Sequence, residues 1–163
     1  VINGTMYLRF EGVKDEVEYR LSKLTEVSRA EVFYGAEADD HWYRLTSMDQ
    51  LFENYDLIMK VILPQYKLGD ALSLVKADYV VKMPMIGEAY LGLRGALSPD
   101  IINAIRNRVS ELGGYLIIVK APLEMKRSID IWGLQQNLDI MAKLKAVFDP
   151  NNVMSYGRFV GGI

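Results

Sequence analysis

The chain has 163 residues, half of them hydrophobic and a quarter charged, with a formal net charge of −2 and no cysteine. This length and composition suit one domain with a packed core, and the weak acidity argues against nucleic-acid binding through phosphate contacts. The lack of cysteine excludes disulfides, thiolate zinc sites and iron–sulfur ligation within the chain, and it fits a reducing, cytoplasmic location.

The first third of the chain predicts a strand–helix–strand unit followed by more helix. Residues 5–10 mix apolar and β-favouring side chains and therefore predict a strand. Between residues 13 and 27, apolar side chains recur every three or four positions, which is typical of an amphipathic helix. Residues 30–34 predict a second strand, and residues 36–54 predict helix in one or two pieces.

An Asp39-Asp40-His41 run lies in this helical segment and has two interpretations. Carboxylates and imidazole bind divalent metals, but ligands must converge on one point, and adjacent residues on a helix point apart. We therefore interpret the run as solvated helix surface, with its acids facing the positive helix N-terminus, and we predict no metal site. His41 is the only histidine, so a histidine-rich site is impossible.

The remaining two thirds of the chain alternate strands and helices. Strands are predicted at residues 57–63, 78–83, 88–94 and 115–120, and helices at residues 67–75, 99–112 and 138–148. Residues 84–87 are short enough for a hairpin turn. Ser98 and Pro99 start the best-defined helix as N-cap and first helical residue. These elements predict an α+β sandwich in which one mostly antiparallel sheet carries helices on one face.

The last twenty residues read L-K-A-V-F-D-P-N-N-V-M-S-Y-G-R-F-V-G-G-I. Asp149-Pro150 ends the preceding helix, because proline disfavours helical geometry in the residue before it, and the apolar residues that follow predict a packed tail. The string resembles the C-terminal signature of the FAD-linked oxidases of the vanillyl-alcohol oxidase superfamily, L-K-x-x-F-D-P-x-x-x-L-N-P-G-R. Within that family it looks most like the FAD-binding subunits of glycolate oxidase. The matching residues are Lys145, Phe148, Asp149, Pro150, Gly157 and Arg158, whereas Ser155-Tyr156 replaces the usual Asn-Pro.

The resemblance implies that residues 1–163 form the C-terminal cap domain of such an oxidase, with a ferredoxin-like fold. It implies FAD as the cofactor, held mainly by an N-terminal FAD-binding domain that we expect to precede this chain. The implied reaction is oxidation of a 2-hydroxy acid to a 2-oxo acid by hydride transfer to the flavin, and the chain alone is expected to be inactive. The implied partners are that N-terminal domain and other glycolate oxidase subunits, through which the protein would lie at the inner membrane.

Five of the six predicted strands carry one basic residue among apolar neighbours: Arg9, Lys60, Lys82, Arg94 and Lys120. Side chains alternate between the two faces of a sheet, and an unpaired cation is costly in a helix-covered core. We therefore expect these cations on the face that the helices leave open. If the resemblance holds, they bind the substrate carboxylate there. Alternatively, each is an ordinary strand residue that pairs with an acid.

Gly157 and Arg158 are the candidate cofactor-binding residues. The resemblance implies that the guanidinium of Arg158, on a turn with Gly157, contacts the flavin domain or the cofactor. The structural alternative is a surface cation packed near the last helix. No catalytic residue is assigned, because the sequence contains no G-x-S-x-G elbow and no cysteine nucleophile.

A second hypothesis from a different functional class needs no further domain. The chain would then be a stand-alone ferredoxin-like module that binds a ligand or regulates another protein, and it would form a homodimer through its sheet. The absence of a phosphate-binding G-x-G-x-x-G loop is compatible with both hypotheses. The two differ in whether a flavin domain precedes the chain.

Overall fold

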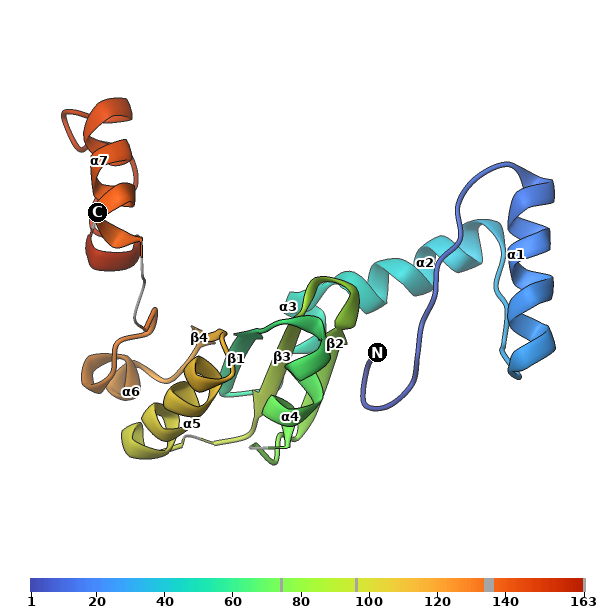
Figure 1. The fold of residues 1–163 in the computed structure, drawn as a ribbon, viewed down its shortest axis with the longest axis horizontal. Coiled ribbons are helices and arrows are strands. Elements are labelled where there is room, and N and C mark those ends of the chain that lie inside the picture. Colours follow the sequence, from blue (N-terminus) through green and yellow to red (C-terminus); the bar gives the residue numbers. More distant parts are fainter. Residues whose placement is uncertain (74, 96, 134–136, 163) are drawn as a thin grey trace. The chain divides into compact units, whose positions relative to one another are not determined.

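The computed structural model describes residues 1–73, 75–95, 97–133 and 137–162. The chain divides into two compact units, Val1–Tyr55 and Asp56–Ile163. Figure 1 shows their elements coloured along the chain. We refer to them as the first unit and the second unit.

The first unit is helical. It contains α1 (Lys14–Val27), α2 (Gly35–Thr46) and the short α3 (Met48–Leu51), as the sequence predicts. The two strands predicted at residues 5–10 and 30–34 are wrong, because both segments are irregular apart from a single bridge between Ile2 and Thr5. Strand preference mostly reflects packing against neighbouring strands. Residues 6–8 lack such packing and their side chains are exposed.

The second unit contains a four-stranded antiparallel sheet. In chain order its elements are β1 (Leu57–Ile62), α4 (Leu68–Leu72), β2 (Tyr79–Met83), β3 (Glu88–Leu93), α5 (Pro99–Glu111) and β4 (Tyr115–Lys120). The strands lie in the order β2-β3-β1-β4, and every neighbouring pair is antiparallel. This βαββαβ arrangement, in which each helical crossover skips one strand, is the ferredoxin-like fold. The predicted fold class is therefore confirmed for this part of the chain.

The core lies between one face of the sheet and the helices. Alternate residues of β1 and β3 are almost fully buried, with Met59 opposite Leu91 and Val61 opposite Ala89. Residues from α4, α5 and α6 (Leu123–Ser128) belong to the same apolar cluster. Since strand side chains alternate between faces, the helices cover this face and the intervening residues form the second face of the sheet.

Local signals in the sequence set the ends of these elements. The Ser98 hydroxyl oxygen accepts a hydrogen bond from the Ile101 amide at 3.4 Å, so the predicted N-cap of α5 is confirmed. Between β2 and β3 the chain turns through a short 3₁₀ segment, Pro84–Ile86, and Gly87. Gly87 has a φ of +71°, and a Cβ there would lie 2.0 Å from the Leu63 carbonyl oxygen. Glycine is therefore required at this turn.

The last part of the second unit is α7 (Leu138–Phe148), whose bounds match the prediction, and a 3₁₀ turn at Val160–Gly162. Before α7, the residues after α6 run beside β4, where the Ile118 amide donates to the Ile131 carbonyl at 2.8 Å.

Among the helices that the structure describes, none is both long enough and apolar enough to cross a membrane.

Candidate functional site

The second face of the sheet carries a cluster of three polar side chains, Lys60, Glu88 and Tyr90. Lys60 lies at the centre of β1, directly opposite Tyr90 on β3, and Glu88 begins β3 two residues earlier. The Lys60 ammonium lies 2.8 Å from a Glu88 carboxylate oxygen and 5.4 Å from the centre of the Tyr90 ring. The side chains of Lys60 and Glu88 are only 23% and 20% exposed. The cluster is therefore partly desolvated and held by strands rather than by loops.

The electrostatics of the cluster keep Lys60 charged. Burial acts to lower the pKa of Lys60, but its hydrogen bonds to Glu88 and Tyr90 outweigh that effect, so the pKa is raised above its usual value. A charged ammonium in this position can donate hydrogen bonds to a carboxylate or to another acceptor. The arrangement thus offers a fixed cationic donor next to a carboxylate acceptor.

The structure does not bring the five predicted cations together. Lys60 lies near the middle of the second face, and Lys120, which ends β4 opposite Ile58, lies at its margin. Arg94 follows the end of β3, where its backbone amide donates to Asp78 at 2.7 Å.

The expectation of one shared face is wrong for Lys82 and Arg9. Lys82 lies opposite the buried Ala89, so the strand register places it on the helix-covered side of the edge strand β2. Arg9 is in the first unit and outside any strand, where it pairs with Glu11 at 2.5 Å and with Asp39 at 3.0 Å.

The residues of the Asp39-Asp40-His41 run turn to three different partners. Asp39 pairs with Arg9, Asp40 pairs with Arg44 at 2.5 Å, and the His41 ring stacks on Phe33 with 4.0 Å between centroids. Within the described part of the chain, no three potential ligands of the His, Cys, Asp and Glu types meet in one place. The run therefore acts as helix surface.

The C-terminal signature forms a local structure around Asp149. Although most of the surrounding segment is exposed, Asp149 is only 6% exposed. Its carboxylate accepts hydrogen bonds from the amides of Val153 and Met154 at 3.0 and 2.9 Å, and it lies 2.5 Å from the Lys145 ammonium. The hydrogen bond from Lys145, followed by those from the two amides, lowers the pKa of Asp149 to about 2. This ion pair folds the tail back against α7.

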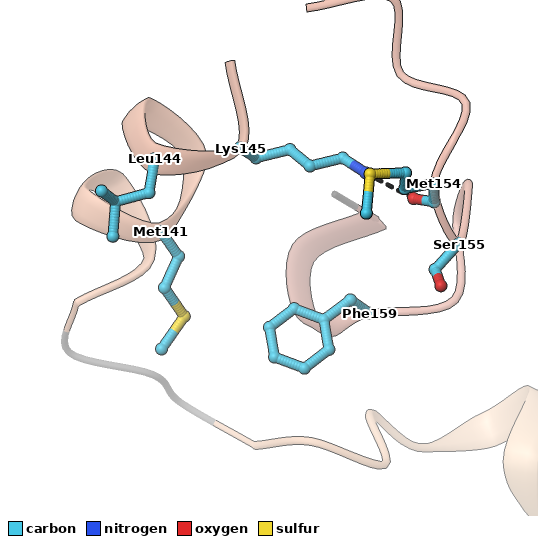
Figure 2. A pocket seen from close by; sticks show the side chains of 6 residues that line it. All are labelled: Met141, Leu144, Lys145, Met154, Ser155 and Phe159. Carbon is cyan, nitrogen blue, oxygen red and sulfur yellow. Dashed lines mark hydrogen bonds between the residues drawn. The ribbon is translucent and has the colours of Figure 1, made fainter. Parts of the chain in front are cut away.

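A hollow of about 390 Å³ opens between α7 and the tail. Figure 2 shows the side chains of Met141 and Phe159 pointing into it, with the Lys145 ammonium donating to the Met154 carbonyl at its edge. Leu144 and Ser155 complete its lining. Of the tail residues that the structure describes after Pro150, only Val160 is buried, and Val153, Met154 and Tyr156 remain 76%, 63% and 73% exposed. The prediction of a packed tail is therefore wrong for most of its length, although hydrogen bonds hold its first residues beside α7. The segment thus presents an apolar surface.

Gly157 and Arg158 lie in an exposed turn of the same segment. The Arg158 amide donates to the Ser155 carbonyl at 3.0 Å, and Gly157 has a φ of +64°. A Cβ at Gly157 would meet nothing within 4 Å, so this glycine serves the turn and not a close approach. The two residues form no cradle for a cofactor, and Arg158 lies exposed at the surface.

The sequence offers Tyr7, Tyr34, Tyr79 and Tyr90 as possible neighbours of the strand cations, and the structure places Tyr90 opposite Lys60. The sequence does not predict Glu88 as the partner of Lys60, because their contact depends on the register between β1 and β3. The ion pair between Lys145 and Asp149 could have been predicted from the sequence, because opposite charges four residues apart on a helix lie close enough to interact.

No family model, curated protein or solved structure matches the chain.

Proposed function

We propose that the chain is the C-terminal cap region of an FAD-dependent oxidoreductase subunit that oxidises 2-hydroxy acids to 2-oxo acids, similar to the FAD-binding subunit of glycolate oxidase. The observation that carries the proposal is the structure around Asp149. Lys145 and Asp149, two residues of the signature shared with the FAD-linked oxidases, bind each other, and Asp149 also fixes the backbone that leads to Gly157 and Arg158. These signature residues thus form one local structure, which supports the proposal.

Two further features support the proposal. The ferredoxin-like fold of residues 57–120 is the fold that the resemblance implies for a cap domain. The apolar surface of α7 and the tail, with Val147, Phe148 and Tyr156 more than 70% exposed, needs a protein partner to remove it from water. We propose that the partner is the N-terminal FAD-binding domain of the same protein.

The division of labour follows from this arrangement. The flavin supplies hydride chemistry when bound, and the FAD-binding domain holds most of it. The residues of the present chain cover the substrate and provide the polar groups of the sheet face. The protein would be cytoplasmic, and other glycolate oxidase subunits would bind it at the inner membrane.

The test is to express the complete reading frame that contains these residues and to record its absorbance. We expect a yellow protein whose flavin bands bleach when glycolate or lactate is added without oxygen. The 163-residue chain alone is the control and should be colourless. A complete protein without flavin, or a flavin that no 2-hydroxy acid reduces, would overturn the proposal and favour the ferredoxin-like ligand-binding module.

A further inference from the structure

The cluster of Lys60, Glu88 and Tyr90 has hydrogen-bonding capacity left over. An ammonium carries three N–H donors. Glu88 and Tyr90 account for two of the donors of Lys60, and no contact to a described residue uses the third. A carboxylate has about four lone-pair sites, so Glu88 can still accept a hydrogen bond. The cluster therefore presents one free donor and one free acceptor side by side.

This pair of groups complements a molecule with the opposite arrangement. A partner that places an anionic acceptor next to an O–H donor matches both groups at once, whereas a simple anion would meet the negative charge of Glu88. The 2.8 Å between the Lys60 nitrogen and the Glu88 oxygen is comparable to the spacing of oxygens on adjacent carbons. A 2-hydroxy acid has such a pair, in its carboxylate and its hydroxyl group.

We infer that Lys60, Glu88 and Tyr90 are the subsite for the 2-hydroxy-acid group of the substrate, which deepens the proposed function and rests on it. The third N–H of Lys60 donates to the substrate carboxylate. Glu88 accepts the hydrogen bond from the substrate hydroxyl. Tyr90 positions the ammonium through its ring and its hydroxyl group. The three residues come from neighbouring central strands, so the subsite is rigid before the ligand arrives.

The geometry also distinguishes Lys60 from the other strand cations. Lys60 is the cation at the centre of the second face, and its side chain is 23% exposed, so a ligand contact there is partly shielded from water. Lys120 is exposed at the end of its strand, and Lys82 lies on the opposite, helix-covered face of the sheet. Charge-assisted hydrogen bonds gain strength as water is excluded. Lys60 is thus the cation that gains most from binding a carboxylate.

The experiment is an NMR titration of the ¹⁵N-labelled 163-residue chain, which requires no flavin. We expect glycolate and lactate to shift the amide signals of Lys60, Glu88 and Tyr90 in a saturable way. Acetate, which lacks the hydroxyl, should bind at least about tenfold more weakly. Equal shifts with acetate, or no saturable shift, would overturn the inference.

Two substitutions test the roles of the side chains. Lys60→Met should weaken glycolate binding by about tenfold or more, and Glu88→Gln, which preserves shape, should reduce the difference between glycolate and acetate. Lys143→Met, an exposed change on α7, is the matched control and should leave binding unchanged. Signal dispersion in each spectrum checks that the variant is folded. An unchanged ratio of glycolate to acetate binding in a folded Glu88→Gln would contradict the assignment.

The outcome separates this inference from the proposed function. If glycolate binds at Lys60 but the complete protein holds no flavin, the subsite stands and the oxidase proposal fails. If 2-hydroxy acids reduce the flavin of the complete protein equally well with Lys60→Met, the oxidase proposal stands and the subsite is wrong.

Discussion

In the second unit, strands and helices bury their apolar side chains in one cluster, and Leu57, Met59 and Leu91 have no exposed surface. In the first unit, all of whose residues the structure describes, only Phe52 is buried. Helices α1 and α2 have no buried residue at all. Amphipathic helices of one sequence can therefore be stabilised differently: α5 packs its apolar side chains into a core, whereas α1 and α2 bury none.

Ion pairs between exposed side chains lie along the helices of the first unit. Along α1, Lys14 pairs with Glu18 and Arg20 with Glu16, and each of these side chains is more than half exposed. Such pairs add only a few tenths of a kcal/mol each. Helices of this length are marginal in water without tertiary packing. We therefore expect the first unit to unfold at a lower denaturant concentration than the second.

The chain offers a separate optical probe for each unit, since its two tryptophans are Trp42 and Trp132. A Trp42→Phe variant reports on the second unit, and Trp132→Phe reports on the first. Urea titrations of the two variants should give two different transitions, with the first unit unfolding at lower urea. Coincident transitions would show that the units unfold as one cooperative body.

The largest expected effect comes from the core of the second unit. Leu91→Ala removes a side chain with no exposed surface and should destabilise the second unit by about 3 kcal/mol or more, since it leaves a cavity. Leu21→Ala on the partly exposed face of α1 is the matched change in the first unit and should cost less than about 1 kcal/mol there. The measurement is urea unfolding with the appropriate tryptophan probe. Equal losses in the two units would refute the contrast.

Two glycines allow the same comparison of the two units, through the stability lost when a Cβ is added to each. Gly87 and Gly35 both have positive φ, but a Cβ would clash with the Leu63 carbonyl only at Gly87 and would meet nothing at Gly35. Gly87→Ala should therefore cost about 1–3 kcal/mol beyond the conformational strain that both share. Thermal unfolding of both variants gives the comparison. A Gly35→Ala variant as unstable as Gly87→Ala would contradict the packing argument.

The ion pair of Asp149 makes the stability of the folded tail depend on pH. Because the pKa of Asp149 in the folded protein, about 2, lies below its ordinary value of 3.8, its carboxylate stabilises the folded tail above pH 3.8. That contribution is lost as the pH falls through about 2. The Trp132 ring lies 5.3 Å from that of Phe159 in the tail, so Trp132 fluorescence in the Trp42→Phe background should change over this range. The same acid transition in an Asp149→Asn variant would exclude Asp149 as its cause.

The smallest expected effect is at the surface of the first unit. Arg9→Gln removes the pairs with Glu11 and Asp39 and the contact of the guanidinium with the Trp42 ring at 5.8 Å. These groups are largely exposed, so the loss should be below about 1 kcal/mol and should shrink at high salt. Trp42 fluorescence during urea unfolding, at low and high salt, is the measurement. A large, salt-independent loss would mean that Arg9 has a buried role.

The sequence predicted elements well where local patterns and long-range packing agree. The bounds of α7 and the Ser98 cap of α5 follow from residues close in the chain. The strand predicted at residues 5–10 failed because a strand needs a partner, and nothing in those six residues specifies one. The placement of Lys82 failed for a related reason: its face depends on pairing with β3, and a shift of one residue reverses it.

The site was less predictable than the fold. Lys60 was a candidate from sequence, but Glu88 becomes its partner only through an antiparallel register between strands that are 26 or more residues apart in the chain. The sequence predicts Asp149 at the end of a helix, but its burial depends on the tail folding back to supply two amides. Sequence patterns identify residue types and periods, whereas sites of this kind arise from tertiary pairing.

The hydrogen bond from Ile118 to Ile131 has a consequence for self-association. Sheets grow into fibrils when each molecule offers two unpaired margins, one to each neighbour. In this protein the Ile118 amide on β4 already donates to the chain that follows α6. A second molecule that paired with this margin of β4 would have to displace that segment, so this short internal contact disfavours strand addition at β4.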